Sequence, residues 1–331
     1  MRDINVLLVV DKSAGMAELH ATNIGVSKWD TMRSALGAMF TKGEGTSVDG
    51  HAYINLGLEL FPQGPAATDT WTDSCFIRDG GGAITVPIQT GKARLNDVFD
   101  AINAESPSGY APTAEALRRA YDYYTKGDGY CLPGSKWVLL VTNGGANCNS
   151  SLNCGACTPI PCPGGAGNCC LGANYLCNDD DSVVSAIGDL ASAGIKTFVA
   201  GMPESDADAA SLNAFANAGM MPNPNGPNGN GYYPIPDTLD ASDLECAFFC
   251  ITTRLIASCD IPLRWSPATS DNAHVFINCM PVPASPSDSS SGWYFDFNQS
   301  PAHVIFHGDV CTEMYSSVVH AVDIFTGCTT P

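Results

Sequence analysis

Short apolar runs alternate with amphipathic helical patterns over roughly the first 250 residues, and this alternation constrains the fold more than any other feature. Residues 4–10 form an apolar run that ends at Asp11, which is typical of a buried strand followed by a loop. Strands are also predicted at residues 54–61, 136–142 and 195–200, and helices at residues 28–42, 93–105, 112–126, 180–193, 208–218 and 240–258. Strands separated by helices imply βαβ units. We therefore predict an α/β fold with a doubly wound, mostly parallel sheet of about six strands flanked by helices.

Two stretches depart from this alternation. Residues 222–237 are rich in Pro, Asn and Gly, and we predict that they form only loop. From Cys259 onward the helical patterns give way to short strand patterns, at residues 274–277, 293–297, 303–306 and 322–325. We expect a small C-terminal β extension pinned by Cys259, Cys279, Cys311 and Cys328. The chain is thus divided into residues 1–258 and residues 259–331.

The chain contains 15 cysteines in 331 residues, which favours disulfides formed in an oxidising compartment. Because the number is odd, at least one thiol is free or is paired outside this chain. The cysteines expected in disulfides are Cys75, Cys131, Cys148, Cys154, Cys157, Cys162, Cys169, Cys170, Cys177, Cys246, Cys250, Cys259, Cys279, Cys311 and Cys328. We expect an extracellular or cell-surface protein whose signal or anchor segment is not in this chain, because its apolar start reads as a strand.

Residues 148–178 hold many of these cysteines together with Gly, Pro and Asn. The pair Cys154-x-x-Cys157 can suggest zinc, but no second well-spaced pair follows it. We interpret the stretch as a surface insertion stapled by disulfides. The acidic run at residues 179–181 is predicted to begin a helix rather than to hold Ca²⁺.

The charge of the chain excludes some classes of partner. Lys and Arg number 15 against 34 Asp and Glu, a formal net charge of −19. Such a field repels phosphate backbones and anionic membrane surfaces, so neither is expected as a ligand. The sequence contains no convincing nucleophile elbow, paired-carboxylate motif, phosphate loop or dinucleotide fingerprint, and no catalytic residues are assigned.

Three loops of this first region carry candidate functional residues. The first is Asp11-Lys12-Ser13-Ala14-Gly15, the second runs over residues 109–117, and the third is Thr142-Asn143-Gly144. Two of these loops follow predicted strands and one opens a predicted helix. Open α/β sheets bind their ligands in the crevice at the carboxyl ends of their strands. These loops therefore form the candidate site.

In order and in flanking elements, the loops resemble those of von Willebrand factor type A (vWA, integrin I-like) domains. That family assembles a metal-ion-dependent adhesion site from D-x-S-x-S, a Thr of G-x-T-x-T and the Asp of T-D-G. The resemblance covers roughly residues 4–258 and implies a non-enzymatic adhesion or binding module. Its partner would be a protein or a polysaccharide on a surface.

This chain departs from the family pattern at three positions. Asp11 and Ser13 match, whereas Gly15, Ala111 and Asn143 stand where the family has Ser, Thr and Asp. Glycine and alanine side chains cannot ligate a metal, and Mg²⁺ demands near-octahedral oxygen coordination. The metal-binding residues expected to remain are Asp11 and Ser13, enough for weak Mg²⁺ or Ca²⁺ binding at most.

The ligand-binding positions carried over from the resemblance are Asp11, Ser13, Gly15, Ala111, Thr113 and Asn143. Thr113 lies two residues beyond the position of the family's Thr, and we assign it to the start of the helix. The insertion follows the third loop, which suggests that it roofs the site or forms the contact surface. The alternative is a structural envelope or filament subunit in which the site is a relic, and a cysteine free to crosslink subunits would favour it.

Overall fold

The computed structural model describes most of the first 237 residues and several segments beyond them. The described residues are 2–20, 25–40, 52–63, 84–89, 95–148, 178–223, 226–237, 259–262, 273–277, 280–285, 291–298, 302–314 and 322–326. The chain divides into two compact units, Met1–Phe248 and Phe249–Pro331. The boundary predicted at residue 258 stays a prediction, because residues 238–258 lie outside the described segments.

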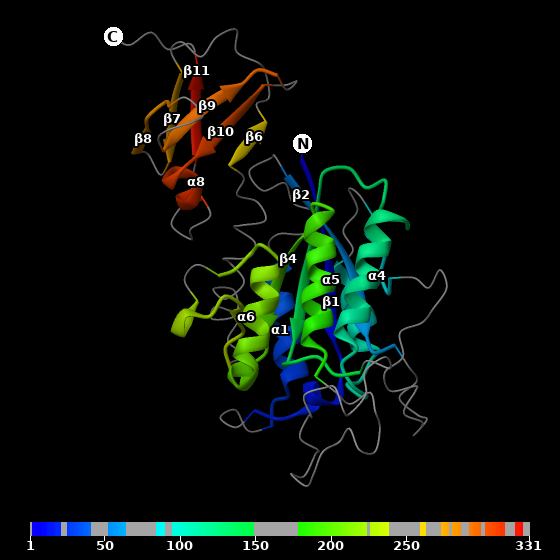
Figure 1. Cartoon of the computed structure of the whole chain (residues 1–331). Coiled ribbons are helices and arrows are strands. Elements are labelled where there is room, and N and C mark those ends of the chain that lie inside the picture. The colour runs from blue at the N-terminus through cyan, green and yellow to red at the C-terminus, as the bar shows by residue number, and fades with distance from the viewer. Residues whose placement is uncertain are drawn as a thin grey trace. The chain divides into compact units, whose positions relative to one another are not determined.

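Among the described residues, a five-stranded parallel sheet in the order β2-β1-β3-β4-β5 forms the centre of the first unit (Figure 1). Its strands are β1 (Arg2–Asp11), β2 (Ala52–Phe61), β3 (Ser135–Thr142), β4 (Lys196–Gly201) and β5 (Tyr233–Pro234). Its helices are α1 (Lys28–Phe40), α3 (Leu95–Asn103), α4 (Thr113–Thr125), α5 (Asp180–Ser192) and α6 (Ala209–Ala218). Short 3₁₀ turns are η1 (Ala14–Ala17), η3 (Ser205–Asp208) and η4 (Pro227–Gly229). The predicted α/β fold with a parallel sheet and flanking helices is confirmed.

The direction of the crossovers decides which face each helix covers. From β1 the chain steps one way to β2, whereas from β2 onward it steps back across β1 to β3, β4 and β5. Right-handed crossovers therefore place α1 on one face and α4, α5 and α6 on the other, as Figure 1 shows. Alternate strand residues fill the core beneath α4, α5 and α6, among them Leu7, Val9 and Leu140.

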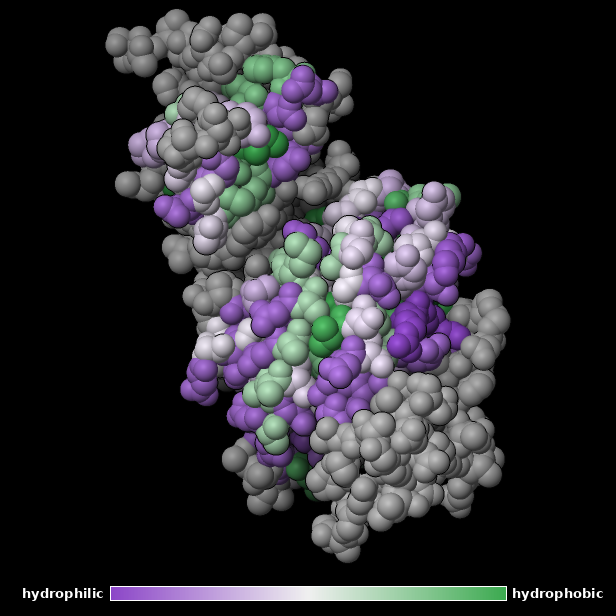
Figure 2. Space-filling view, viewed as in Figure 1, coloured by the Kyte–Doolittle hydropathy of each residue, from purple (hydrophilic) through white to green (hydrophobic). Residues whose placement is uncertain are grey.

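The outer surface of α4, α5 and α6 mixes hydrophilic and hydrophobic residues on the face shown in Figure 2. None of the helices in the described segments is both long and apolar enough to cross a membrane.

The prediction that residues 222–237 are loop throughout is wrong at one place. Tyr233 and Pro234 form β5, which pairs in parallel with Ala200 and Gly201 of β4. The Ile235 N–H also donates to the carbonyl oxygen of Gly201 (2.8 Å). A proline fits here because β5 is an edge strand and needs hydrogen bonds on one side only. Pairing at an edge is decided by the neighbouring strand, which local composition does not reveal. The helix predicted at residues 240–258 lies outside the described residues.

The described segments of the second unit form two three-stranded antiparallel sheets, β6-β10-β9 and β11-β7-β8. Its elements are β6 (Asp260–Pro262), β7 (Ala273–Ile277), β8 (Met280–Val282), β9 (Gly292–Asp296), β10 (His303–His307), α8 (Asp309–Met314) and β11 (Val322–Thr326). The predicted strands at residues 274–277, 293–297, 303–306 and 322–325 correspond to β7, β9, β10 and β11, whereas β6, β8 and α8 were not predicted. Val275, Ile277, Trp293, Phe295, Val304 and Phe306 form its core.

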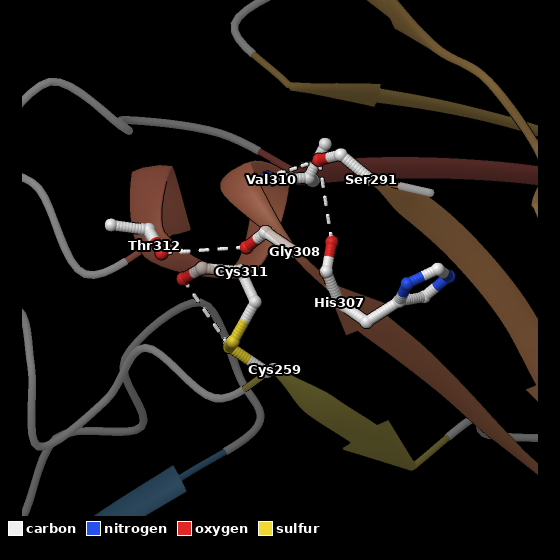
Figure 3. Close-up of a disulfide and its surroundings, with 7 residues drawn as sticks. All are labelled: Cys259, Ser291, His307, Gly308, Val310, Cys311 and Thr312. Carbon is white, nitrogen blue, oxygen red and sulfur yellow. Dashed lines mark hydrogen bonds between the residues drawn. A yellow bond between two sulfur atoms is a disulfide. The ribbon is translucent and has the colours of Figure 1, made fainter. Parts of the chain in front are cut away.

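A disulfide between Cys259 and Cys311 joins the residue before β6 to α8 (Figure 3). Beside it, the Val310 N–H donates to Oγ of Ser291 (2.8 Å), which ties the start of α8 to β9. The predicted β extension with a disulfide is therefore confirmed for this pair. Cys279 and Cys328 lie outside the described residues.

Candidate functional site

The order of the strands places a topological switch point between β1 and β3. The chain leaves β1 toward one edge of the sheet and β3 toward the other, so the two crossovers diverge at this point. Doubly wound sheets bind ligands at such a switch point, outside the carboxyl ends of the strands. Here those ends are Asp11 and Thr142.

Asp11 joins the loops that leave these two strands. Its side chain is fully buried. Oδ1 accepts the Ser13 N–H (2.7 Å), and Oδ2 accepts the Thr142 hydroxyl (2.9 Å). Burial raises the pKa of the Asp11 carboxyl above its usual value, against the lowering effect of the hydrogen bonds from Ser13, Thr142 and Asn143. The Oδ1 bond therefore shapes the first loop, and the Oδ2 bond joins it to the start of the third loop.

Gly15 and Asn143, two of the positions that depart from the vWA pattern, lie against each other. A Cβ added at Gly15 would lie 2.1 Å from Nδ2 of Asn143. The Asn143 amide thus occupies space that a side chain at position 15 would need. The absence of a side chain at Gly15 therefore makes room for the Asn143 side chain.

The second loop is fastened to the first by its backbone. The Ala14 N–H donates to the carbonyl oxygen of Gly109 (2.9 Å), and the Ser108 N–H donates to that of Lys12 (2.7 Å). The buried Lys12 side chain extends to the Glu105 carboxylate, with 3.0 Å between Nζ and Oε2.

Ala111 meets the base of the cysteine-rich insertion through its backbone. Its N–H donates to Oδ1 of Asn147 (2.8 Å), and its carbonyl oxygen accepts the Asn147 N–H (3.1 Å). The insertion leaves and returns at this point, because Asn147 forms an antiparallel bridge with Asn178. Sequence reasoning missed Asn147. Its side-chain oxygen accepts a backbone N–H as a main-chain carbonyl oxygen would, and no sequence motif marks this role.

Thr113 begins α4 and is buried. Its N–H donates to the carbonyl oxygen of Ala111 (2.8 Å), and its hydroxyl lies 3.4 Å from the same oxygen. Two pairs of predicted site residues are thus in direct contact: Asp11 with Ser13, and Gly15 with Asn143. Ala111 joins them through the backbone of the second loop.

Two aspartates that sequence reasoning did not place at the site lie beside the third loop. A Cβ added at Gly144 would lie 2.3 Å from Oδ2 of Asp208. Burial raises the pKa of Asp208, the Gly145 N–H lowers it, and the charge of Asp180 adds to the rise. Asp180 accepts the Ala146 N–H (3.3 Å) and the Asn178 amide (2.8 Å). The acidic start of α5 therefore supports the loops, whereas Asp179 at the N-cap makes no capping hydrogen bond with its side chain.

The cysteine assignment needs one correction. Cys131, which we expected in a disulfide, is free and exposed. It lies in the turn between α4 and β3. Cys148 is disulfide-bonded, and the other cysteines of the insertion lie outside the described residues.

The parallel sheet, its two helical layers and the three loops at the β1/β3 switch point give this chain a vWA-like α/β fold. No protein-family model matches the sequence, and no curated protein matches it. Among solved structures, the chain is similar to the pilus adhesin SpaC from Lactobacillus rhamnosus GG in its open conformation, with 14% identity and a TM-score of 0.47. That similarity covers 93% of this chain and 37% of SpaC, so this chain spans well under half of that protein.

Two further similar structures are components of pili. One is a point mutant of the PilB minor pilin from Streptococcus sanguinis, with 15% identity, a TM-score of 0.45, and coverage of 77% of this chain and 62% of that chain. The other is the vWF domain of the type V pili tip protein Mfa5 from Porphyromonas gingivalis, with 12% identity and a TM-score of 0.43. It covers 76% of this chain and 94% of that chain.

Proposed function

We propose that this protein is a non-enzymatic binding module of the cell surface or extracellular space that recognises a protein or polysaccharide. The contact surface is formed by the loops at the β1/β3 switch point together with the cysteine-rich insertion (residues 148–178). One observation carries this proposal: both ends of the insertion are joined to the site, through the Asn147–Asn178 bridge and the two hydrogen bonds between the Ala111 backbone and Asn147. A large insertion anchored at the switch point of a doubly wound sheet is well placed to contact a partner.

The binding is independent of Mg²⁺ in this proposal. Of the vWA-like ligand positions, Asp11 and Ser13 match the family, whereas Asn143 offers a neutral amide oxygen in place of a carboxylate. Both Asp11 carboxylate oxygens accept hydrogen bonds within the protein. The amide of Asn143 lies against Gly15, where the vWA pattern has a hydroxyl ligand. Mg²⁺ requires six well-placed oxygen ligands, and these residues do not provide enough of them for tight binding.

The location outside the cytoplasm rests on the 15 cysteines and the disulfide between Cys259 and Cys311. Disulfides form and persist in oxidising compartments. The net charge of −19 keeps such a protein soluble and directs recognition away from anionic membranes and nucleic acids.

The test is a binding screen against immobilised extracellular proteins and polysaccharides, run in EDTA and again in millimolar Mg²⁺. We expect at least one partner to be bound equally well in both buffers. A variant in which residues 149–177 are replaced by Gly-Gly, with Cys148→Ser, should lose that binding. The short linker is sufficient because Asn147 and Asn178 already pair across the base of the insertion.

The matched control is Lys126→Ala, an exposed residue just beyond α4, at the opposite end of that helix from the site. It should bind as the wild type does. Full binding by a folded deletion variant would contradict the assignment of the contact surface. Binding that is abolished by EDTA and restored by Mg²⁺ would contradict metal independence.

A second candidate function is a subunit of an envelope or filament. The free, exposed thiol of Cys131 favours it, because such a thiol can crosslink two copies. Mild oxidation should then give a dimer on a non-reducing gel that Cys131→Ser abolishes. A monomer at all concentrations and oxidant levels would remove this candidate.

A further inference from the structure

Three potential metal ligands from separate loops meet near the carboxyl edge of the sheet. His20 lies between η1 and α1, Glu204 comes three residues after β4, and Asp237 comes three residues after β5. One nitrogen of His20 and one carboxylate oxygen each of Glu204 and Asp237 lie within 4.8 Å of one another. None of the three belongs to the Asp11 network or to the vWA-like ligand positions.

The His20 ring is held in an orientation that leaves one nitrogen for a ligand. Its side chain is fully buried, and Nε2 pairs with the hydroxyl of the buried Thr31 (2.8 Å). Nδ1 is buried and makes no hydrogen bond with the described residues. Metal-binding histidines commonly use their second nitrogen for such an orienting hydrogen bond, which fixes the tautomer and the ring plane.

Asp237 faces this nitrogen. Its Oδ1 lies 3.3 Å from Nδ1 of His20, yet neither Oδ1 nor Oδ2 has a hydrogen-bond partner among the described residues. Buried polar atoms are nearly always satisfied, and leaving one unpaired is destabilising. An ion pair with His20 alone would leave Oδ2 unsatisfied. A cation held between the two side chains would give both Nδ1 and the carboxylate a partner.

Glu204 completes the cluster from the solvent side. Its side chain is exposed, so an ion can reach the cluster past it. Its backbone has a φ of 65°, in the left-handed region that residues other than glycine seldom occupy. Such a conformation persists where the surrounding structure enforces it, which fixes the backbone from which this side chain extends.

We propose that His20, Glu204 and Asp237 form a binding site for a divalent transition-metal ion, Zn²⁺ above all. One imidazole nitrogen and two carboxylate oxygens are a ligand set that Zn²⁺ accepts in tetrahedral geometry, with a fourth position for water. The imidazole disfavours Mg²⁺ and Ca²⁺, which take oxygen ligands. Two carboxylates balance the charge of the dication. The proposal is independent of the proposed binding function.

The test uses the full chain with its disulfides intact in a Cys131→Ser background, because the free thiol would itself bind Zn²⁺. After chelator treatment and buffer exchange, the protein is titrated calorimetrically with Zn²⁺ and separately with Mg²⁺. We expect saturable binding of one Zn²⁺ and far weaker binding of Mg²⁺. Co²⁺ in place of Zn²⁺ should give visible absorption bands of tetrahedral intensity.

The substitutions Asp237→Asn and Glu204→Gln each remove a charged ligand while keeping the shape of the side chain. Each should weaken Zn²⁺ binding about 10-fold or more and abolish the Co²⁺ bands. Glu115→Gln, an exposed carboxylate on α4 outside the cluster, should leave both unchanged. If Asp237→Asn does not fold, the exposed Glu204 decides the question.

Two results would overturn the proposal. One is the absence of saturable Zn²⁺ binding by the wild-type cluster, which would leave His20 and Asp237 as an ion pair. The other is Zn²⁺ binding that Glu204→Gln and Asp237→Asn leave unaltered, which would place the metal on other carboxylates of this acidic chain.

Discussion

Gly15 and Asn143 show at the scale of single residues how one departure from the vWA pattern accommodates another. The missing side chain at position 15 leaves the space that the Asn143 amide occupies. A serine at position 15 alone would therefore clash with the Asn143 amide instead of recreating a metal ligand.

Gly15→Ala should destabilise the first unit by about 1 kcal/mol, because the added Cβ displaces the far end of a flexible side chain. In the Asn143→Ala background the same substitution should be close to neutral. A double-mutant cycle measured by urea denaturation would then give a coupling of about 1 kcal/mol. Additive effects would mean that the two residues do not compete for the same space.

Glu59, near the carboxyl end of the long strand β2, makes the stability of the first unit depend on pH. Its side chain is buried, and burial raises the pKa of its carboxyl to about 8 from a usual 4.5, although the charge of Arg119 lowers it. Oε1 accepts the Gln63 amide (2.8 Å), whereas Oε2 has no hydrogen-bond partner among the described residues. The folded state therefore keeps a proton that the unfolded chain releases.

Because the folded pKa is raised, the contribution of Glu59 is fully present below the unfolded pKa and is lost as pH rises through about 8. Between pH 6 and pH 8, the wild type should lose about 2 kcal/mol of unfolding free energy relative to Glu59→Gln. Urea denaturation of both proteins at several pH values measures this difference. Parallel pH profiles would show that Glu59 is ionised in the folded state near neutral pH.

At the scale of elements, α4 is fastened across the two central strands by one hydroxyl. Tyr124 is almost completely buried, and its Oη lies 3.1 Å from the carbonyl oxygen of Asn5 in β1 and 3.0 Å from that of Trp137 in β3. The helix that begins at the second site loop thus also contacts the far end of the strands that carry the first and third loops.

Tyr124→Phe should lower the unfolding free energy by about 1 kcal/mol, since it removes a buried hydrogen bond and little else. Tyr130→Phe is the matched control, because Tyr130 is 63% exposed. It should change stability by less than about 0.5 kcal/mol. Equal effects of the two substitutions in thermal or urea denaturation would contradict the anchoring role of the Tyr124 hydroxyl.

At the scale of the whole molecule, each of the two units has a hydrophobic core of its own. Among the described residues, the core of the second unit is small, with six buried apolar side chains, and the Cys259–Cys311 disulfide packs against it. Small cores of this kind depend on crosslinks for their stability.

Replacing both Cys259 and Cys311 by serine removes a crosslink that spans a sequence separation of 52 residues. The second unit should lose about 4 kcal/mol of stability by the chain-entropy relation. Hydrogen exchange should rise in peptides covering β9 and β10 and stay unchanged in those covering β1 and β3. Increased exchange in both sets would show that the two units unfold as one cooperative body.

The sequence by itself determined the elements whose signal lies within a few residues of chain. The predicted strand at residues 136–142 is β3 (Ser135–Thr142), and the predicted helix at residues 112–126 is α4 (Thr113–Thr125). Both are recognisable because apolar periodicity is a local property that burial enforces. The same reasoning placed Asp11 and Asn143 where two predicted strands end, and the structure shows that these strands are neighbours in the sheet.

Only the tertiary structure decided which residues from distant loops meet. The pairing of Tyr233 with β4, the contact of Asn143 with Gly15 and the meeting of His20 with Asp237 depend on the parallel register and the crossovers. A sequence pattern describes neighbours along the chain, whereas each of these contacts joins segments brought together only when the sheet assembles.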